Sequence, residues 1–318
     1  MGQTLAEFDI HARDKAIKIS FADFMKEYNP LYSKIFKVTD TKEWTESFTT
    51  REGMSGVGKL SEYGTAKEQK RVEGFKTSID AEVFVGVLTW THEQELKAMD
   101  STTKWGEMIG DDIAQQVMTM NRQIETTAFD LLRNAFSEDT NTVYAPDAKP
   151  LISENHIWNT PGAPIWSNEI TGNFTEANWA EIKSRGSNFR GSQGGDDFWP
   201  QNYDTLIVQE NSANHRLIQK TFSIGAGNLY AATVDGLNIY ANNKIKLVTV
   251  PYFADTPNRW FAQASASERS LYFKFIERPN IQATNTATIG VEKRPIFATF
   301  GAGVRKQPID LIGSRGAA

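Results

Sequence analysis

The chain has 318 residues, with 34 basic and 39 acidic side chains, a formal net charge of -5 and no cysteine. The lack of cysteine excludes a disulfide scaffold, a thiolate metal site and a cysteine nucleophile. A content of 40% hydrophobic and 23% charged residues is typical of a folded protein, and the acidic balance argues against a nucleic-acid reader, which normally carries a basic face.

Residues 1–48 are predicted to form an N-terminal arm with one or two short helices. A helix is expected over residues 20–28, where Asn29-Pro30 would end it. The arm has too few apolar side chains to form a core of its own, so we expect them to lie on a neighbouring surface, with packing on the arm's own domain as the open alternative. The side chains expected to make this contact are Phe8, Ile17, Phe21 and Phe24.

Residues 49–78 are predicted to form a projecting two-stranded hairpin, because glycine and charges of both signs are frequent there. The return strand continues to residue 87, and Val83, Val85 and Val87 share the parity of Ile79, which predicts one half-buried strand. A free two-stranded ribbon is marginal in water, so this one should lie on another surface. The charged residues expected to contact that surface are Arg51, Glu52, Lys59, Glu62, Lys67, Glu68, Lys70, Arg71 and Glu73.

A long helix is predicted over residues 103–137, capped by Asp100-Ser101-Thr102. Apolar side chains recur at close to helical spacing from Trp105 to Ala135 and form one stripe. At about 1.5 Å per residue this helix would span roughly 50 Å, which predicts a strut along an elongated body. A shorter helix is expected before it, from Thr91 to Met99.

The second half is predicted to be a mixed α and β lobe with short strands. Residues 141–172 are rich in proline and asparagine and predict a linker, and residues 185–200 predict a glycine-rich loop. Helices are expected from Thr175 to about residue 184 and over residues 212–221. Strands are expected over residues 203–209, 237–240, 245–250, 259–264, 271–277 and 296–304.

No motif predicts a catalytic, cofactor-binding or metal site. Residues 53–60 match the phosphate-binding loop pattern except at Leu60, where the pattern needs Ser or Thr. The four histidines are scattered without metal-binding spacing, and each is expected to be a surface or cap residue. A group of tryptophans could line a carbohydrate cleft, but core or interface packing is favoured for Trp158, Trp166, Trp179 and Trp199.

Taken in this order, the elements resemble those of the major capsid proteins of tailed bacteriophages, which have the Hong Kong 97 type fold, and among these the Mu-type major head subunits. The likeness spans residues 52–310 and rests on the joint order and spacing of several segments, including residues 145–152, 173–185, 200–208, 248–251, 260–262, 275–279 and 297–304. The resemblance implies an α+β fold with four parts. These are an N-terminal arm (1–48), an extended loop (49–78), a peripheral domain with a spine helix (79–172 and 286–318) and an axial domain (173–285).

The resemblance also implies a structural protein, not an enzyme, that has no cofactor and assembles into the pentamers and hexamers of an icosahedral phage head around double-stranded DNA. The implied partners are other copies of the chain, a separate scaffolding protein, a portal, a decoration protein and, through non-specific contact, the packaged DNA. No membrane partner is expected, because no window of about twenty apolar residues occurs. The implied location is the virion capsid, assembled in the host cytoplasm.

Four residues are expected to lie in a loop near the symmetry axis of these assemblies: Arg185, Arg190, Gly194 and Gly195. An encapsulin-like nanocompartment shell, which shares the fold, is the alternative function. A carbohydrate-acting enzyme is the rival from a different class.

Overall fold

The structure is a computed structural model that describes residues 15, 17–26, 28–54, 71–91, 102–137, 145–192, 199–222, 245–265, 269–282 and 291–317. Its labelled helices are α2 (Tyr32–Ile35), α4 (Thr102–Arg133), α5 (Glu176–Ser187) and α6 (Ala213–Phe222). Its strands are β1 (Lys37–Asp40), β2 (Thr45–Met54), β3 (Arg71–Asp80), β4 (Glu82–Thr91), β5 (Glu169–Ile170), β6 (Tyr203–Gln209), β7 (Lys246–Val250), β8 (Trp260–Ala264), β9 (Leu271–Ile281), β10 (Val291–Val304) and β11 (Leu311–Ser314).

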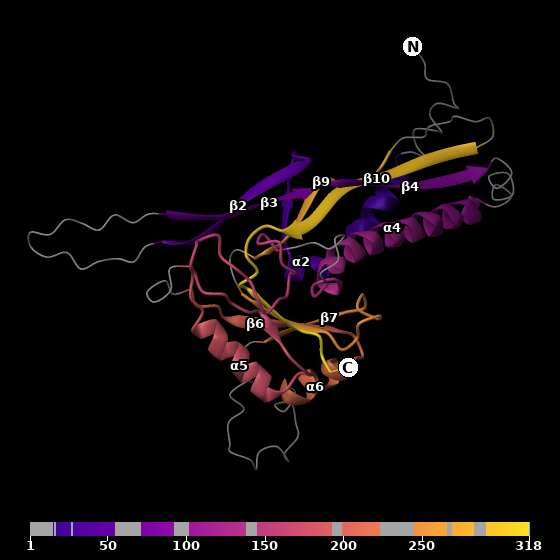
Figure 1. Ribbon diagram of the computed structural model, residues 1–318. Coiled ribbons are helices and arrows are strands. Elements are labelled where there is room, and N and C mark those ends of the chain that lie inside the picture. Colours follow the sequence, from indigo (N-terminus) through magenta and orange to yellow (C-terminus); the bar gives the residue numbers. More distant parts are fainter. Residues whose placement is uncertain are drawn as a thin grey trace, which may run out of the picture.

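The molecule has an elongated upper layer and a lower lobe (Figure 1). The upper layer contains a four-stranded sheet of order β1-β9-β10-β4 and the long helix α4 beside it. The lower lobe contains a five-stranded sheet of order β5-β11-β8-β6-β7, with α5 and α6 below it. Strands β2 and β3 form a separate two-stranded sheet that leaves one end of the upper layer.

Helix α4 confirms the predicted strut. Its apolar stripe is buried from Ile109 through Ile113 and Val117 to Ile124 and Ala128, as the helical period requires. Phe129 and Leu132 lie off this stripe and are also fully buried. The second half of α4 therefore buries a wider part of its surface than the predicted stripe.

The predicted continuous strand through residues 75–87 is wrong. The chain breaks at Ala81, whose N–H donates to the Trp44 carbonyl at 2.9 Å, and β4 begins after it with the opposite parity. Leu88 and Trp90 are buried, and the Trp90 indole donates to Asp112 of α4 at 2.8 Å. The valines at positions 83, 85 and 87 consequently face outward, each about half exposed.

The lower sheet is apolar on both faces, which explains the uninterrupted hydrophobic run in β6. Leu206, Ile207 and Val208 are all fully buried. Leu206 and Val208 belong to the core formed with Trp179 of α5, whereas Ile207 belongs to the core shared with α4. The alternation of side chains along a strand thus joins the lower lobe to the upper layer.

Most other predicted elements of the second half are confirmed. Thr175 caps α5 by accepting from the Asn178 N–H at 3.1 Å, and the helix ends at Ser187 instead of residue 184. Strands β7 to β10 lie where strand-like runs were predicted. The predicted helix from residue 91 to 99 and the strand at 237–240 lie outside the described residues, except that Thr91 ends β4.

Candidate functional site

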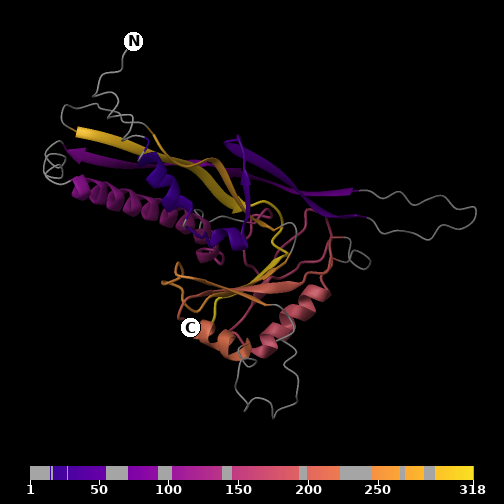
Figure 2. The same ribbon diagram turned by 180° about the vertical axis from the view of Figure 1, so that it is seen from behind.

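The hairpin β2–β3 is the first candidate, because it projects from the body in both views (Figures 1 and 2). Within the described residues its strands pair only with each other. Its base is fixed to β9, where Lys274 donates to the carbonyls of Glu43 and Trp44 at 3.1 and 2.7 Å. The Tyr272 hydroxyl donates to the Glu46 carboxylate at 3.1 Å. Burial lowers the pKa of Lys274. These hydrogen bonds attach the foot of the hairpin to the upper layer.

Glu52 was expected to be a solvated contact residue of the hairpin, and this prediction is wrong. Its side chain is fully buried within its own chain. The carboxylate accepts from the N–H groups of Asn159 and Thr160 at 2.5 and 3.1 Å, and from the Thr160 hydroxyl at 3.1 Å. The Glu52 carbonyl accepts from the N–H and the hydroxyl of Ser192 at 3.1 and 2.7 Å. Glu52 therefore attaches the hairpin to two distant parts of the chain.

The other charged residues assigned to the hairpin are only partly described. Glu73 is exposed on β3, and its contact with a neighbouring surface stays a prediction. Arg51 and Arg71 lie on β2 and β3 respectively. The remaining five lie outside the described residues: Lys59, Glu62, Lys67, Glu68 and Lys70.

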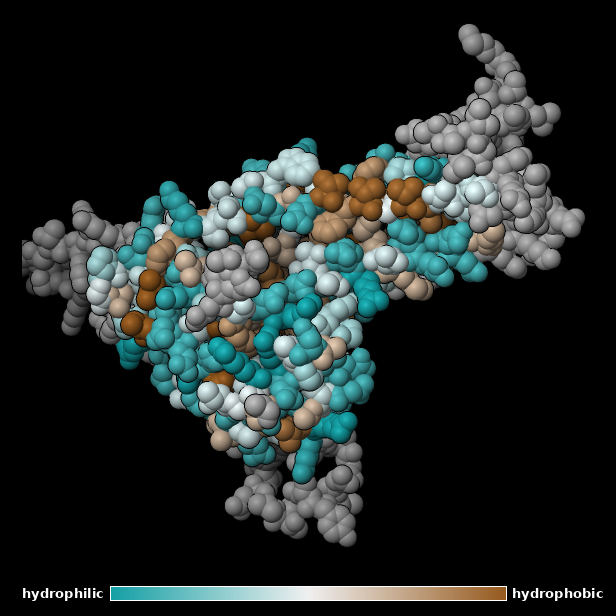
Figure 3. Space-filling model, turned by 45° about the vertical axis from the view of Figure 1, so that its right-hand side comes forward, coloured by the Kyte–Doolittle hydropathy of each residue, from teal (hydrophilic) through white to brown (hydrophobic). Residues whose placement is uncertain are grey.

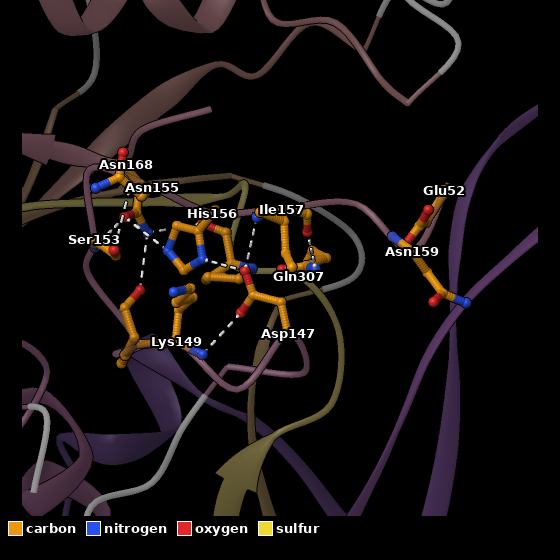
Figure 4. A network of polar contacts seen from close by, with 12 residues as sticks. Glu52, Asp147, Lys149, Ser153, Asn155, His156, Ile157, Asn159, Asn168 and Gln307 are labelled. Atoms are coloured by element: carbon orange, nitrogen blue, oxygen red, sulfur yellow. Dashed lines mark hydrogen bonds and ion pairs between the residues drawn. The ribbon is translucent and has the colours of Figure 1, made fainter. Parts of the chain in front are cut away.

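The segment that receives Glu52 is a short tongue, residues 156–166, closed at its base by two backbone hydrogen bonds between His156 and Trp166. Figure 4 shows the His156 ring between Asp147 and Asn168. Nδ1 lies 2.8 Å from the Asp147 carboxylate, and Nε2 lies 3.1 Å from the Asn168 amide oxygen. His156 is fully buried, so its expected surface or cap position is wrong. This network gives the tongue a fixed base.

The outer face of the upper sheet is the second candidate. The exposed valines 83 and 85 of β4 stand opposite Thr299 and Phe297 of β10, and Val87 stands opposite Pro295. Directly paired residues share a face of the sheet, so the three valines form one strip with the partly exposed Pro295 and Phe297, whereas Thr299 is buried. We call this strip the valine face. Figure 3 shows hydrophobic side chains gathered in a row along the upper layer. A contiguous exposed apolar strip of this kind is typical of a protein contact.

The N-terminal arm contacts its own body more than predicted. Ile17 and Phe21 are buried in the core that contains α4, and Phe24 packs partly against the same core. The prediction that Ile17 and Phe21 contact another surface is wrong, because α4 supplies the apolar partner that the arm lacks. Phe8 lies outside the described residues.

Glu125 of α4 fixes the end of the arm. One carboxylate oxygen accepts from the Tyr28 hydroxyl and from the Leu31 N–H, the latter at 2.6 Å, and the other accepts from the Tyr32 N–H at 3.1 Å. Burial raises the pKa of Glu125 above its usual value of 4.5, although the hydrogen bonds it accepts oppose the shift. Removal of the carboxylate from water is thus the largest influence on the pKa of Glu125.

We expect the stability of the subunit to depend on pH through Glu125. Because its pKa is raised in the folded state, its contribution is complete below the unfolded pKa of about 4.5 and is lost as the pH rises through the raised value. The free energy of unfolding of the wild type, minus that of Glu125→Gln, should therefore fall between pH 4.5 and 8. Urea unfolding at several pH values measures it, with Glu82→Gln as the exposed control. A difference that is constant over this range contradicts the assignment.

The residues predicted to lie in the axial loop fall in different places. Arg185 is helical and pairs with Glu181 one turn earlier, at 2.6 Å, and also donates to the Glu169 carbonyl. Its prediction as a loop residue is wrong, because α5 continues past it. Arg190 is exposed beyond the end of α5, and Gly194 and Gly195 lie outside the described residues.

The tryptophans pack against other aromatic rings. Trp179 is fully buried in the lower core. Trp158 lies 5.8 Å from Trp166 and 6.3 Å from Trp199, measured between ring centroids. Within the described residues, no group of His, Asp or Glu side chains could hold a metal ion. No helix of the described part is both long and apolar enough to cross a membrane.

Comparison with known proteins identifies the fold. No family model and no curated protein matches the chain. The capsid of the native GTA particle aligns with a TM-score of 0.54 and 11% identity over 92% of each chain. The capsid of Myoviridae phage XM1 aligns with a TM-score of 0.51 and 12% identity over 88% of this chain and 90% of the other. The chain has the Hong Kong 97 type capsid fold.

A structure from Gordonia phage Cozz gives the same result, with a TM-score of 0.52 and 12% identity over 91% of this chain and 87% of the other. The predicted α+β capsid fold is confirmed. At these identities the likeness is one of fold. The likeness to the Mu-type subunits and the proposed domain boundaries stay predictions. The assignment of the hairpin as the extended loop and of α4 as the spine helix also stays a prediction.

Proposed function

We propose that the chain is the major capsid protein of a tailed phage, which assembles into the pentamers and hexamers of an icosahedral head around double-stranded DNA. The observation that carries the proposal is the hairpin β2–β3, which leaves the body of a capsid fold and pairs only with itself among the described residues. A two-stranded ribbon of this kind is marginal in water. It gains stability when it lies on a neighbouring subunit.

The valine face is the surface that receives the neighbour's hairpin in this proposal. It offers apolar side chains that are about half exposed in the single chain, and its strand β4 forms an edge of the upper sheet. Covering apolar area stabilises the contact, whereas exposed ion pairs contribute only about 0 to 1 kcal/mol each. Charged residues of the hairpin, such as Glu73, would then set the register between subunits.

The further partners follow from the same proposal. Other copies of the chain make the shell, a separate scaffolding protein guides its assembly, and a portal and a decoration protein complete it. Contact with packaged DNA is non-specific, in keeping with the net charge of -5. The head is assembled in the host cytoplasm and the chain then resides in the virion capsid. It acts through contacts between subunits and not as an enzyme, and the buried packing of Trp158 and Trp179 supports this over a carbohydrate cleft.

Electron microscopy of the purified protein tests the proposal. We expect negatively stained images to contain rings of five and six subunits or closed shells, in place of single chains of 35.6 kDa. When the shells come from infected cells, double-stranded DNA inside them should survive nuclease treatment and be released when the protein is denatured. A shell filled with a cargo protein would support the encapsulin-like alternative, and a small oligomer that never forms rings would contradict both.

A further inference from the structure

We infer that Glu52 is a positioning residue that sets the direction of the hairpin relative to the lower lobe. The inference rests on the proposed function in one respect only: the hairpin direction matters because the hairpin reaches a neighbouring subunit. The attachment itself is a property of the single chain.

The backbone conformation around Glu52 leaves this residue unpaired between β2 and β3. Arg51 pairs with Glu73, and Gly53 pairs with Val72, so Glu52 is the extra residue of a bulge on β2. A bulge leaves its extra residue without a partner in the ladder. Gly74 on the opposite strand provides the space, because a Cβ there would lie 2.7 Å from Glu52 Cγ.

The carboxylate of Glu52 fastens the hairpin to the tip of the tongue. Glu52 accepts hydrogen bonds from two successive N–H groups and from one hydroxyl, so three donors of the tongue hold its carboxylate in place. The tongue cannot follow the hairpin freely. Its base is held by His156, and the Ile157 carbonyl accepts from Gln307 at 3.1 Å (Figure 4).

The tongue leads from Glu52 to the lower sheet. Asn168 contacts the His156 ring and donates to the Leu151 carbonyl at 2.9 Å. Its own carbonyl accepts from the Gly313 N–H of β11 at 2.9 Å. Hydrogen bonds therefore run from the hairpin through the tongue to a strand inside the lower lobe.

The carbonyl of Glu52 makes a second, independent connection. Ser192 follows α5 and donates to this carbonyl through both its N–H and its hydroxyl. A displacement of Ser192 would therefore also displace Glu52. With its foot on β9 through Lys274 and its side on the lower lobe through Glu52, the hairpin has two attachments. Two separated attachments define a direction, whereas the foot alone permits rotation.

Pulsed electron paramagnetic resonance on the full chain tests the inference. The chain has no cysteine, so nitroxide labels can be attached at Glu73→Cys on β3 and Glu176→Cys on α5, two exposed positions. We expect one narrow distance distribution between the labels in this background. Adding Glu52→Ala should abolish the narrow peak and give a broad distribution. Adding Glu82→Gln, which removes an exposed carboxylate elsewhere, should leave the peak unchanged.

Two milder variants keep the test decisive if Glu52→Ala does not fold. Thr160→Val and Ser192→Ala each remove one hydroxyl donor and leave the carboxylate in place. We expect both to broaden the distribution, and more so in combination. A narrow, unshifted peak in Glu52→Ala, or in the folded double variant, overturns the inference.

Imaging of the same proteins separates this inference from the proposed function. If the unlabelled wild type forms shells, Glu52→Ala should yield shells of irregular curvature or open sheets. If the wild type forms no rings or shells while Glu52→Ala still loses the narrow peak, the positioning role stands and the proposed function fails. If the wild type forms shells and the peak persists in Glu52→Ala, the proposed function stands and the positioning role fails.

Discussion

Replacing Val85 with glutamate is expected to leave the subunit folded and to abolish shell formation. Val85 lies at the centre of the valine face, about half exposed, so the single chain tolerates a charge there. In the proposed shell the same position is covered by a neighbour, and burying an unpaired carboxylate costs several kcal/mol. That cost recurs at every subunit contact, so we expect at least a tenfold loss of sedimenting particles.

The matched control is Val85→Thr, which keeps the β-branched shape and adds no charge. It should still form particles, at a reduced yield, because only one methyl group is exchanged for a hydroxyl. Sedimentation measures assembly, and circular dichroism with urea unfolding shows that each subunit is folded. Normal particle yield from a folded Val85→Glu would contradict the role of the valine face.

Replacing Gly301 with alanine is expected to lower the free energy of unfolding by about 2 to 3 kcal/mol. Gly301 lies on β10, next to Asp80 and Ala81, at which the chain passes from the hairpin to β4. An added Cβ would lie 2.0 Å from the Asp80 carbonyl oxygen and 3.2 Å from Ala81 Cα. Both neighbours are backbone atoms, so no side-chain rotation relieves the overlap. The crossing strands must separate instead, which would also disturb the foot of the hairpin.

Two other glycines provide graded controls. At Gly303 the added Cβ would meet the Ile79 side chain at 2.7 Å, which can shift, so we expect a loss of about 1 kcal/mol. At Gly110 in α4 nothing lies within 4 Å, and alanine should stabilise the helix by about 0.5 to 1 kcal/mol. Urea unfolding of the three variants should reproduce this order. Equal stability of Gly301→Ala and the wild type would show that the crossing is not tight.

Local patterns in the sequence predicted the elements whose burial follows one period. The prediction of the apolar stripe of α4 was correct because Ile113, Val117 and Ile124, which recur at helical spacing, are buried in the core. Strand β6 was correct because an uninterrupted apolar run bounded by polar residues fits a strand buried on both faces. The prediction that Thr175 caps α5 was correct because an N-cap depends only on the side chain of that residue and on the backbone N–H groups of the first helical turn.

The predictions were wrong where a segment distant in the sequence determines whether a side chain is buried. Ile17 and Phe21 are buried in a core that includes residues of α4, about a hundred positions later, which the spacing within the arm does not reveal. Glu52 is one of many charged residues in its segment. It reaches the tongue only because the bulge in β2 leaves it unpaired between the two strands. The valines face outward because the strand is interrupted at Ala81, after which the side chains of even-numbered positions point to the core. Neither proline nor glycine stands there to indicate the interruption. His156 is buried because Asp147 and Asn168 meet around it.

The strand order has a consequence for synthesis on the ribosome. Strand β10 lies between β9 and β4 in the upper sheet, and β11 lies between β5 and β8 in the lower one. Both are translated after every other strand of their sheets. A nascent chain that has emerged only to residue 290 thus lacks the strand that joins β9 to β4 in the upper sheet and the strand that joins β5 to β8 in the lower one. Both sheets are therefore completed only when the last 28 residues of the chain, 291–318, have been made.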